Sequence, residues 1–364
     1  MLPPIAMQHS SSLAGRSLEV RLAAERPQRC RRLQAVTPQC QAERRQQRNR
    51  AAAVEAPTSS APGGPPAMNG SSPRLVRFGF PKGSLQKSTE DLFKRAGFKV
   101  KISERGYFPR IDDEELQMVL FRSQEISRYV EDGVLDAGIC GRDWVVESGA
   151  DVVEVCELRY SKATSNPARW VLAVPEASPV QRAEDLAGTI VASELVNTTR
   201  RFFEERGIAV RKVEYSWGAT EVKASLPGVG GIVDITETGS SLKANNLRVV
   251  DTILASTTRL VANKAAWVDA GKRSKIEDLA LLLQGAIDGK EKVGLKMNLP
   301  KDRLAAVSAL LPAERSPTVS HLVDSDFLAV EVVLDERQAR ELIPACKRLG
   351  ATGIFSYPID VIIH

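Results

Sequence analysis

The residues best suited to chemistry lie in one short stretch at positions 230–247, which reads GGIVDITETGSSLKANNL. Residues 231–235 are a mainly apolar run typical of a strand, residues 236–241 are small or hydroxylic apart from Glu237, and Leu242 onward predicts the start of a helix. Such a turn aims backbone N–H groups at one point, and the helix N-terminus adds partial positive charge. The stretch therefore favours an anion-binding loop, with a Gly-rich connection that binds nothing as the alternative.

Three acidic residues distinguish this loop from a plain anion site. Asp234 ends the apolar run, Glu237 lies within the turn, and Glu221 precedes both in a GATE motif. Carboxylates beside a phosphate are costly unless a metal ion or a developing positive charge is also present. The combination favours a reaction in which positive charge appears. The alternatives are a capping role for Asp234 and surface positions for the two glutamates.

Three further strand ends carry residues suited to polar ligands, namely segments 81–85 (PKGSL), 138–143 (GICGRD) and 193–199 (SELVNTT). Ligands of open α/β sheets bind at the carboxyl ends of strands. Two α/β lobes that face each other are therefore expected to bring all four loops to one cleft. Asn197 and Thr198 fit equally well as capping residues of the following helix.

Length and composition indicate the fold class. With 364 residues, 43% of them hydrophobic and 26% charged, the chain can bury two or three cores, and no apolar stretch approaches the roughly 20 residues of a membrane helix. Strands and helices alternate, which predicts an α/β protein with mainly parallel sheets. From residue 292 the expected order is strand, helix, strand, strand, helix, strand, as in a ferredoxin-like or ACT-type module.

Residues 1–73 differ from the rest in composition. They contain ten arginines, four glutamates and neither lysine nor aspartate, and they end in SSAPGGPPAMNGSSP. This composition predicts a disordered segment and is typical of an organellar transit peptide. The chloroplast is the expected location only through the family resemblance given below. A basic arm for nucleic acid is the alternative. Without this segment the formal charge falls from +5 to −1, so no polynucleotide partner is expected for the globular part.

The cysteines and histidines do not predict a metal centre. Cys140, Cys156 and Cys346, the cysteines outside the first 73 residues, show no CxxC spacing, and the chain has three histidines. A zinc site or a Cys–His nucleophile pair is therefore not expected. Reduced, structural thiols are the better interpretation.

Four motifs, in this order, resemble those of the ATP phosphoribosyltransferase family. They are RFGFPKGSLQKST, RSQEISRYVEDGVLDAGICGRDWV, SELVNTTRRFF and GATEVKASLPGVGGIVDITETGSSLKANNL. The resemblance covers residues 74–364 and, with the C-terminal module, is to the long form of the family. It implies a two-lobed catalytic unit of the type II periplasmic-binding-protein kind and an ACT-like regulatory domain. The expected parts are lobe I (74–167 plus 253–288), lobe II (168–252) and the regulatory domain (289–364).

The resemblance also implies a reaction and its partners. Family members are glycosyltransferases that join N1 of the adenine of ATP to C1 of phosphoribosyl pyrophosphate and release pyrophosphate, the first step of histidine biosynthesis. Mg²⁺ enters on the pyrophosphate, histidine is the feedback inhibitor, and the expected assembly is a homo-oligomer, a dimer or hexamer. Displacement at an anomeric carbon has oxocarbenium-like character, so positioning and electrostatics are expected to carry catalysis.

Matches to the family motifs imply individual roles. The catalytic candidates are Asp234, Glu221, Glu237, Lys82 and Arg122. The loop expected to wrap the 5′-phosphate consists of Thr238, Gly239, Ser240, Ser241 and Leu242. The nucleotide side is expected at Gly83, Ser84, Gly138, Gly141 and Asp143, and the histidine effector at Asn298, Thr318 and Gly353.

Three points qualify these assignments. The family motif commonly reads K-G-R-L, whereas this chain has Ser84 in place of the arginine. One phosphate contact must therefore be lost, weakened or made by a nearby cation such as Lys87. Trp144 is expected to pack in the core rather than to stack on a base. Lys82 and Arg122 suit phosphate chemically, with solvated surface positions as the alternative.

Two other functions share part of this pattern. A non-catalytic, two-lobed module that binds a small anion has similar loops, but it gives no reason for three carboxylates around the site. A phosphoribosyltransferase with a different acceptor base shares the 236–241 loop, but neither the order of the four motifs nor the C-terminal module.

Overall fold

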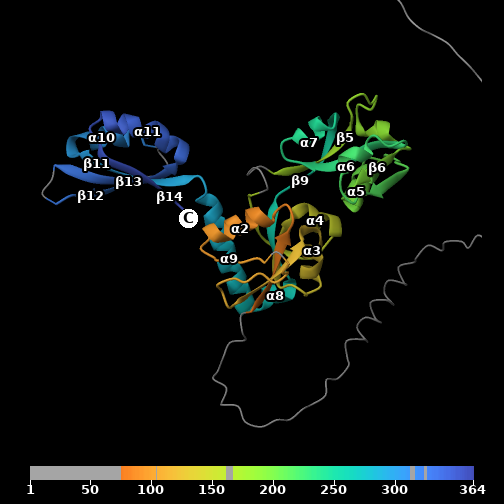
Figure 1. The fold of residues 1–364 in the computed structure, drawn as a ribbon, viewed down its shortest axis with the longest axis horizontal. Coiled ribbons are helices and arrows are strands. Elements are labelled where there is room, and N and C mark those ends of the chain that lie inside the picture. The colour runs from red at the N-terminus through yellow and green to blue at the C-terminus, as the bar shows by residue number, and fades with distance from the viewer. Residues whose placement is uncertain (1–74, 104, 161–166, 312–315, 324–325) are drawn as a thin grey trace, which may run out of the picture. The chain divides into compact units, whose positions relative to one another are not determined.

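The computed structural model describes residues 75–103, 105–160, 167–311, 316–323 and 326–364 (Figure 1). Within these ranges the longer strands form three sheets. No helix in these ranges is long and apolar enough to cross a membrane. The predicted transit peptide at 1–73 lies outside the described residues.

The first sheet has the strand order β2-β1-β3-β10-β4. Its strands are β1 (Val76–Lys82), β2 (Leu116–Arg122), β3 (Ala137–Gly141), β4 (Val153–Leu158) and β10 (Thr258–Ala262). The associated helices are α2 (Gln86–Arg95), α3 (Ser123–Glu131), α4 (Arg142–Ser148), α8 (Lys264–Val268) and α9 (Ala270–Asp288). These elements are called lobe I below.

The second sheet has the order β7-β6-β8-β5-β9. Its strands are β5 (Ala168–Pro175), β6 (Ile190–Ser193), β7 (Lys212–Tyr215), β8 (Val229–Thr236) and β9 (Leu247–Ser256). The helical segments are η1 (Ala183–Leu186), α5 (Val196–Glu205), α6 (Thr220–Lys223) and α7 (Ser240–Ala244). These elements are called lobe II below. The domain boundaries given above stay a prediction.

The two sheets share one topology. In each, three neighbouring strands run parallel, and one strand runs antiparallel to both of its neighbours: β10 in lobe I and β5 in lobe II. The two-lobed, type II periplasmic-binding-protein-like fold is confirmed. In each of these two sheets four of the five strands run in one direction, so the sheets are mixed, with one reversed strand each. The chain reaches β5 from β4 of lobe I and reaches β10 from β9 of lobe II, so neither strand follows the helical crossover that makes neighbouring strands parallel.

The third sheet has the order β12-β13-β11-β14, with antiparallel neighbours throughout. It consists of β11 (Lys292–Pro300), β12 (Thr318–His321), β13 (Phe327–Asp335) and β14 (Thr352–Pro358). Its helical segments are η2 (Lys301–Arg303), α10 (Leu304–Ser308) and α11 (Glu336–Arg348). The predicted βαββαβ module is therefore present.

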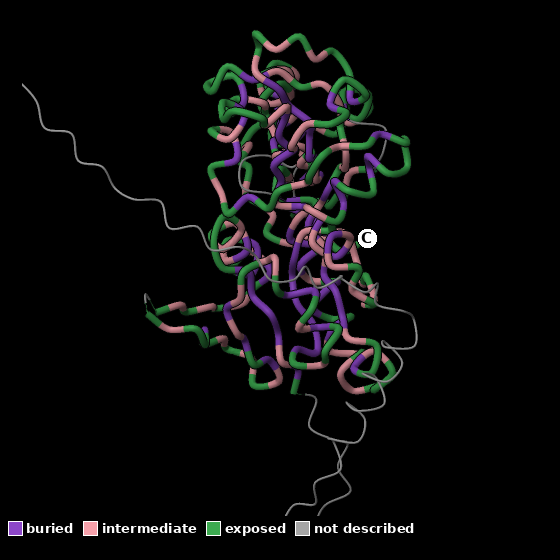
Figure 2. The backbone as a smooth tube through the Cα atoms, turned by 90° about the vertical axis from the view of Figure 1, so that its right-hand side faces the viewer, coloured by how far each residue is buried: buried purple, intermediate pink, exposed green. Residues whose placement is uncertain are grey.

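Each sheet has its own apolar core, and Figure 2 shows the buried residues running along the strands. In lobe I, the ring of Phe93 on α2 packs against Phe78 and Phe80 on β1, with centroid distances of 5.9 and 5.4 Å. This packing fixes α2 against β1, and therefore the loop between them. That loop is the predicted PKGSL segment.

Candidate active site

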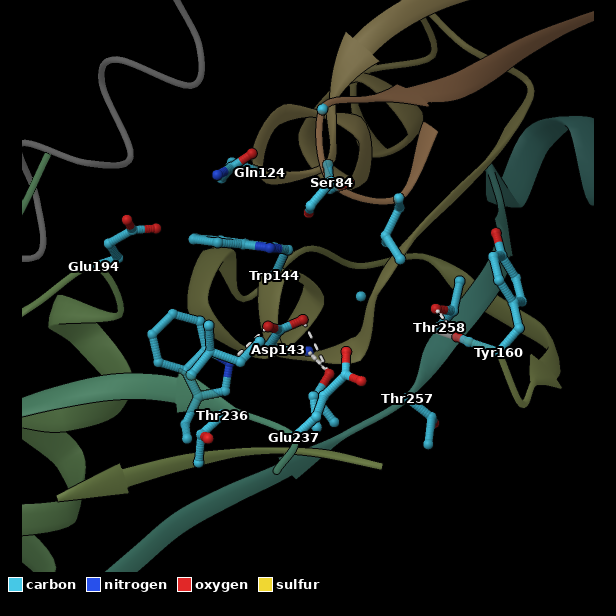
Figure 3. Close-up of a pocket in the computed structure, with 18 of the residues that line it drawn as sticks. Ser84, Gln124, Asp143, Trp144, Tyr160, Glu194, Thr236, Glu237, Thr257 and Thr258 are labelled. Carbon is cyan, nitrogen blue, oxygen red and sulfur yellow. Dashed lines mark hydrogen bonds between the residues drawn. The ribbon is translucent and has the colours of Figure 1, made fainter. Parts of the chain in front are cut away.

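A cavity of about 610 Å³ is lined by loops from both lobes (Figure 3). Lobe I contributes residues of the 81–85 loop, residues 122–124 and the start of α4, and lobe II contributes Glu194 and most of the 235–241 segment. All four loops singled out in the sequence therefore supply lining residues. Ligand pockets typically span about 300–1,000 Å³, so the volume suits a nucleotide-sized ligand.

Two cationic side chains stand on the lobe I side of the cavity. Lys82 ends β1 and Arg122 ends β2, and the two are directly paired in the parallel register. Both are exposed and both line the cavity. The Lys82 ammonium also lies 4.1 Å from the centre of the Tyr107 ring. The arrangement offers a point charge beside a guanidinium fork, which suits phosphate oxygens.

The neighbourhood of Ser84 differs from the expectation. Ser84 lines the cavity, whereas Lys87 is not among the lining residues and pairs with Asp91 at 2.8 Å. Lys87 is therefore a poor candidate for the missing arginine contact. The additional lining cation is Arg159, whose Nε lies 3.2 Å from Glu157. Arg159 follows β4 in a segment without any recognisable motif, so it could not be selected from the sequence.

The predicted phosphate loop connects β8 to α7 on the lobe II side. Gly239 adopts a left-handed backbone (φ +79°), and its N–H donates to Thr236 Oγ1 at 2.8 Å. Thr238, Ser240 and Ser241 are exposed and line the cavity. The hydroxyls of Thr238 and Ser240 lie 2.9 Å apart. Helix α7 begins at Ser240, two residues earlier than predicted.

Leu242 has a different role from the one implied by the motif. Its side chain is 2% exposed and belongs to a buried cluster with Val171 and Ile232. It is not among the lining residues. Leu242 therefore anchors α7 to the sheet, and its neighbours in the loop carry the polar groups.

Carboxylates gather behind this loop. Burial, followed by the negative charges of Glu221 and Glu194, raises the pKa of Asp234 to about 6, although the Ile235 N–H opposes the shift. Glu221 accepts a hydrogen bond from Ser241 Oγ at 2.5 Å. Asp234 and Glu221 thus lie next to the cavity without being lining residues, whereas Glu194 lines it.

Glu194 was not selected from the sequence, although it lies within the SELVNTT segment. Burial raises its pKa, and the nearby positive charges of Lys223 and Arg122 oppose that shift. Its position directly after β6 was the available signal. Glu237, which directly follows β8, lines the same cavity (Figure 3).

The glycines of the DAGICG segment have packing roles. A Cβ on Gly138 would lie 2.6 Å from Ile126 Cγ2 and 3.1 Å from the Gly79 carbonyl oxygen, and Gly138 does not line the cavity. The expectation that Gly138 opens the backbone to a nucleotide therefore has no support. A Cβ on Gly141 would lie 2.0 Å from Asp143 Oδ1, so this glycine makes room for that carboxylate.

Asp143 lines the cavity, but its carboxylate is already engaged. Oδ2 accepts from Trp170 Nε1 at 2.6 Å, and Oδ1 accepts from Ser256 Oγ at 3.0 Å. Burial raises the pKa of Asp143, and these hydrogen bonds lower it. Trp144 packs edge-on against Trp170 at 6.1 Å and also lines the cavity, so it combines core packing with an exposed edge.

Comparisons with known proteins decide the family. Two family models match: ATP phosphoribosyltransferase at residues 122–285 and the HisG C-terminal domain at residues 289–361. The ATP phosphoribosyltransferase of Chlorobium phaeovibrioides is 54% identical over 291 residues, which are 80% of this chain and 98% of that protein. The chain belongs to the ATP phosphoribosyltransferase family.

Other relatives agree with this family assignment. The ATP phosphoribosyltransferase of Pelotomaculum thermopropionicum is 56% identical over 288 residues, 79% of this chain and 99% of the relative. Among solved structures, the ATP phosphoribosyl transferase (HisG:HisZ) complex from Thermotoga maritima matches with a TM-score of 0.50 and 26% identity. That match covers 59% of this chain and 99% of the other.

In this member of the ATP phosphoribosyltransferase family, the predicted effector residues are only partly brought together. Asn298 on β11 is paired with Thr352 of β14, and a Cβ on Gly353 would lie 3.3 Å from Asn298 Nδ2. Thr318 lies on β12, the opposite edge of the sheet. Two of the three residues are therefore neighbours, and the third is two strands away from β11.

Within the described part of the chain, no group of three or more His, Cys, Asp or Glu side chains is arranged to hold a metal ion. The three described cysteines are free, and Cys140 and Cys346 are buried. Burial raises the pKa of Cys156 to about 11. Such thiols are poor nucleophiles at neutral pH.

Proposed function

We propose that this cavity is where ATP and phosphoribosyl pyrophosphate react to give phosphoribosyl-ATP and pyrophosphate, the first step of histidine biosynthesis. The observation that carries the proposal is the division of chemistry across one cavity of about 610 Å³ in a member of this family. Cations line it from lobe I, and a hydroxyl-rich loop backed by carboxylates lines it from lobe II.

The geometry suggests what each side contributes. The hydroxyls of Thr238, Ser240 and Ser241 bind the 5′-phosphate, and the tight turn at Gly239 lets the backbone approach it. Lys82 and Arg122 bind the pyrophosphate and triphosphate oxygens. Lobe II thereby holds the 5′-phosphate, lobe I holds the pyrophosphate and triphosphate groups, and the reacting atoms lie between the lobes.

The chemical step needs no nucleophilic side chain. The N1 lone pair of adenine forms the new bond to C1, and the electrons of the C1–O bond leave with pyrophosphate. Positive charge develops on the ribose ring as that bond lengthens. Asp234 and Glu221, close behind the loop, stabilise this charge electrostatically. Mg²⁺ is part of the substrate, because it enters bound to the pyrophosphate and neutralises the leaving group.

The C-terminal module is proposed to bind histidine and to inhibit the reaction. Asn298 and Gly353 lie side by side on neighbouring strands, and this supports a small polar site there. Thr318 lies on the opposite edge strand, β12, so it can take part in histidine binding only together with another element or another copy of the chain. We further propose a homo-oligomer, a dimer or hexamer, as the sequence resemblance implies.

The N-terminal segment is proposed to direct the protein to the chloroplast. The bacterial relative from Chlorobium is matched over 98% of its length by 80% of this chain, so this chain has additional sequence. An arginine-rich, acid-poor composition at positions 1–73 supports targeting.

The reaction is tested by mixing the purified chain with ATP, phosphoribosyl pyrophosphate and Mg²⁺ and following the ultraviolet absorbance of the adduct. The proposal predicts a signal that requires all three components and that falls when histidine is added. A signal that ignores histidine would leave the transferase and remove the regulatory role. Tight binding of one small anion, with no turnover of wild-type protein, would favour the binding-module alternative.

A further inference from the structure

Helix α4 of lobe I carries two buried carboxylates, four positions apart. Asp143 and Glu147 share one face of the helix because residues i and i+4 are neighbours. Their residues are 3% and 9% exposed. A carboxylate is rarely buried unless donors match its oxygens. The hydrogen-bond partners of these two carboxylates therefore identify the segments to which α4 is attached.

The partners of Asp143 belong to lobe II. Trp170 Nε1, on β5, donates to its Oδ2 at 2.6 Å, and Ser256 Oγ, at the end of β9, donates to its Oδ1 at 3.0 Å (Figure 3). The Asp143 N–H lies 3.0 Å from the same serine oxygen. Trp170 and Ser256 are almost fully buried. The N-terminal end of α4 is thus attached to two strands of the other lobe.

The partners of Glu147 lie at the first turn of α5, also in lobe II. Its carboxylate accepts the backbone N–H groups of Asn197 and Thr198 at 2.8 Å each, and the Thr198 hydroxyl at 2.8 Å. Asn197 Nδ2 donates to the Glu147 carbonyl oxygen at 3.1 Å. Helix N-termini leave such N–H groups unpaired within the helix. A side chain of lobe I therefore caps a helix of lobe II.

This result agrees with neither role considered for Asn197 and Thr198, because both lie inside the first turn of α5, after Leu195 at the N-cap position. Neither residue lines the cavity, and both are held by Glu147. A further bond joins Arg201 Nη2 to the Val146 carbonyl oxygen at 2.8 Å. The contact between α4 and α5 is a polar seam beside the proposed active site, with Glu147 and Thr198 buried and Asn197 and Arg201 exposed.

We propose that Asp143 and Glu147 are positioning residues, which set the separation and angle between the two walls of the active site. The inference rests on the proposed function, in which the two lobes hold different phosphate groups of the reacting substrates. Bond formation then depends on how the lobes are placed, since a misplacement of about 1 Å can lower a rate about 100-fold. Glu147 acts at a distance from the substrates, through the α4–α5 seam.

The test uses the full-length chain with Glu147→Ala and the milder Glu147→Gln. We expect kcat to fall about 10- to 100-fold in Glu147→Ala, because the reacting atoms lose alignment. The dissociation constant and stoichiometry for ATP alone should stay within about twofold of wild type, because the lobe I wall that holds the triphosphate is intact. Glu147→Gln keeps one acceptor oxygen, so its kcat should lie between those of wild type and Glu147→Ala.

Asp185→Ala is the matched control. The Asp185 carboxylate also accepts two backbone N–H groups, from Gln181 at 2.8 Å and Arg182 at 3.2 Å, but all three residues belong to lobe II. The kcat of Asp185→Ala should equal that of wild type. In a double-mutant cycle, Thr198→Val should cost little extra in the Glu147→Ala background, because the two groups act through one contact.

Hydrogen exchange of the Asn197 and Thr198 amides provides a readout that does not depend on turnover. Faster exchange is expected in Glu147→Ala and not in Asp185→Ala. A lower binding stoichiometry in Glu147→Ala, an unchanged kcat, or unchanged exchange would overturn the positioning role. If wild-type protein shows no phosphoribosyl transfer, the proposed function fails, and so does the positioning role of Glu147 in catalysis. The exchange result still decides whether Glu147 holds α5.

Discussion

The ammonium nitrogen of Lys82 lies 4.1 Å from the centre of the Tyr107 ring. An aromatic face attracts a cation without neutralising its charge, so the lysine keeps its full charge for an anionic ligand. The strand pairing places Lys82 beside Arg122 on one side of the cavity, and the ring holds the lysine there. The first prediction tests this arrangement.

Replacing Lys82 with methionine should lower kcat/KM by about 10- to 100-fold, since a charge-assisted hydrogen bond contributes about 1.5–3 kcal/mol. Tyr107→Phe keeps the ring and should stay within about twofold of wild type. Tyr107→Ala should raise KM several-fold, because the lysine is then free to take other conformations. Initial rates against both substrates measure these effects. Equal losses in Tyr107→Phe and Tyr107→Ala would contradict the role of the ring.

The pH dependence of activity should report Asp234. Its pKa is raised to about 6, chiefly by burial. If the ionised carboxylate stabilises the developing charge, kcat/KM falls about tenfold per pH unit below that value. Asp234→Asn should be slow and should lack this acidic limb. Asp251→Asn is the control, because Asp251 also accepts the N–H of the next residue but has a side chain that is 41% exposed and does not line the cavity.

The same shift affects stability. The folded-state pKa of Asp234 lies above the unfolded value, so its stabilising contribution is present below about pH 4 and is lost as pH rises through about 6. Asp234→Asn should therefore be more stable than wild type at pH 8, by up to about 3 kcal/mol. The gain should vanish near pH 4. Urea unfolding at both pH values measures it, and an equal gain at both would exclude this origin.

Gly138→Ala tests the packing role assigned to that glycine. The added methyl would meet the Ile126 side chain and the Gly79 backbone, and the backbone cannot move aside. Such overpacking typically costs about 1–3 kcal/mol. The free energy of unfolding should fall while KM for both substrates stays near that of wild type. A normal stability with a raised KM for ATP would instead restore the nucleotide role.

Gly239→Ala probes the loop by a different route. No atom lies within 4 Å of a Cβ at this position, so space is available, but the left-handed backbone disfavours a side chain by roughly 1–2 kcal/mol. The loop should shift, and KM for phosphoribosyl pyrophosphate should rise more than KM for ATP. Equal effects on the two substrates would argue against a phosphate loop in lobe II.

Sequence patterns predicted those parts of the molecule that depend on local chemistry. The turn between β8 and α7 was recognisable because small and hydroxylic residues at 236–241 follow an apolar run. The βαββαβ order followed from alternating strand and helix patterns. Hydrophobic pattern carries no information on strand direction, however, so the reversed strands β5 and β10 were missed.

Contacts between distant segments were beyond the reach of such patterns. Arg159 lies in a crossover without a motif, and its place at the cavity depends on how the two lobes meet. Glu147 reads as an ordinary helix residue until α5 is placed beside it. Asp143 was selected as a nucleotide residue because its motif adjoins the cleft, whereas the structure shows a carboxylate committed to Trp170 and Ser256.

Asn298→Ala should reduce inhibition by histidine without changing turnover in its absence. Asn298 lies on β11 next to Gly353, on a sheet that supplies no lining residue to the described cavity. Loss of one hydrogen bond to a charged ligand should raise the half-inhibitory concentration about tenfold. Ser320→Ala, on the edge strand β12, is a suitable control. A fall in uninhibited kcat would place Asn298 in the catalytic path instead.

The bond formed by the enzyme tests the central claim most directly. Phosphoribosyl pyrophosphate labelled with ¹³C at C1 and ATP labelled with ¹⁵N at N1 are incubated with the full-length chain and Mg²⁺, and the product is examined by nuclear magnetic resonance. The account predicts a one-bond coupling between the two labels, formed in step with release of pyrophosphate. Turnover without this coupling, or no turnover by wild-type protein that binds both substrates, would contradict it.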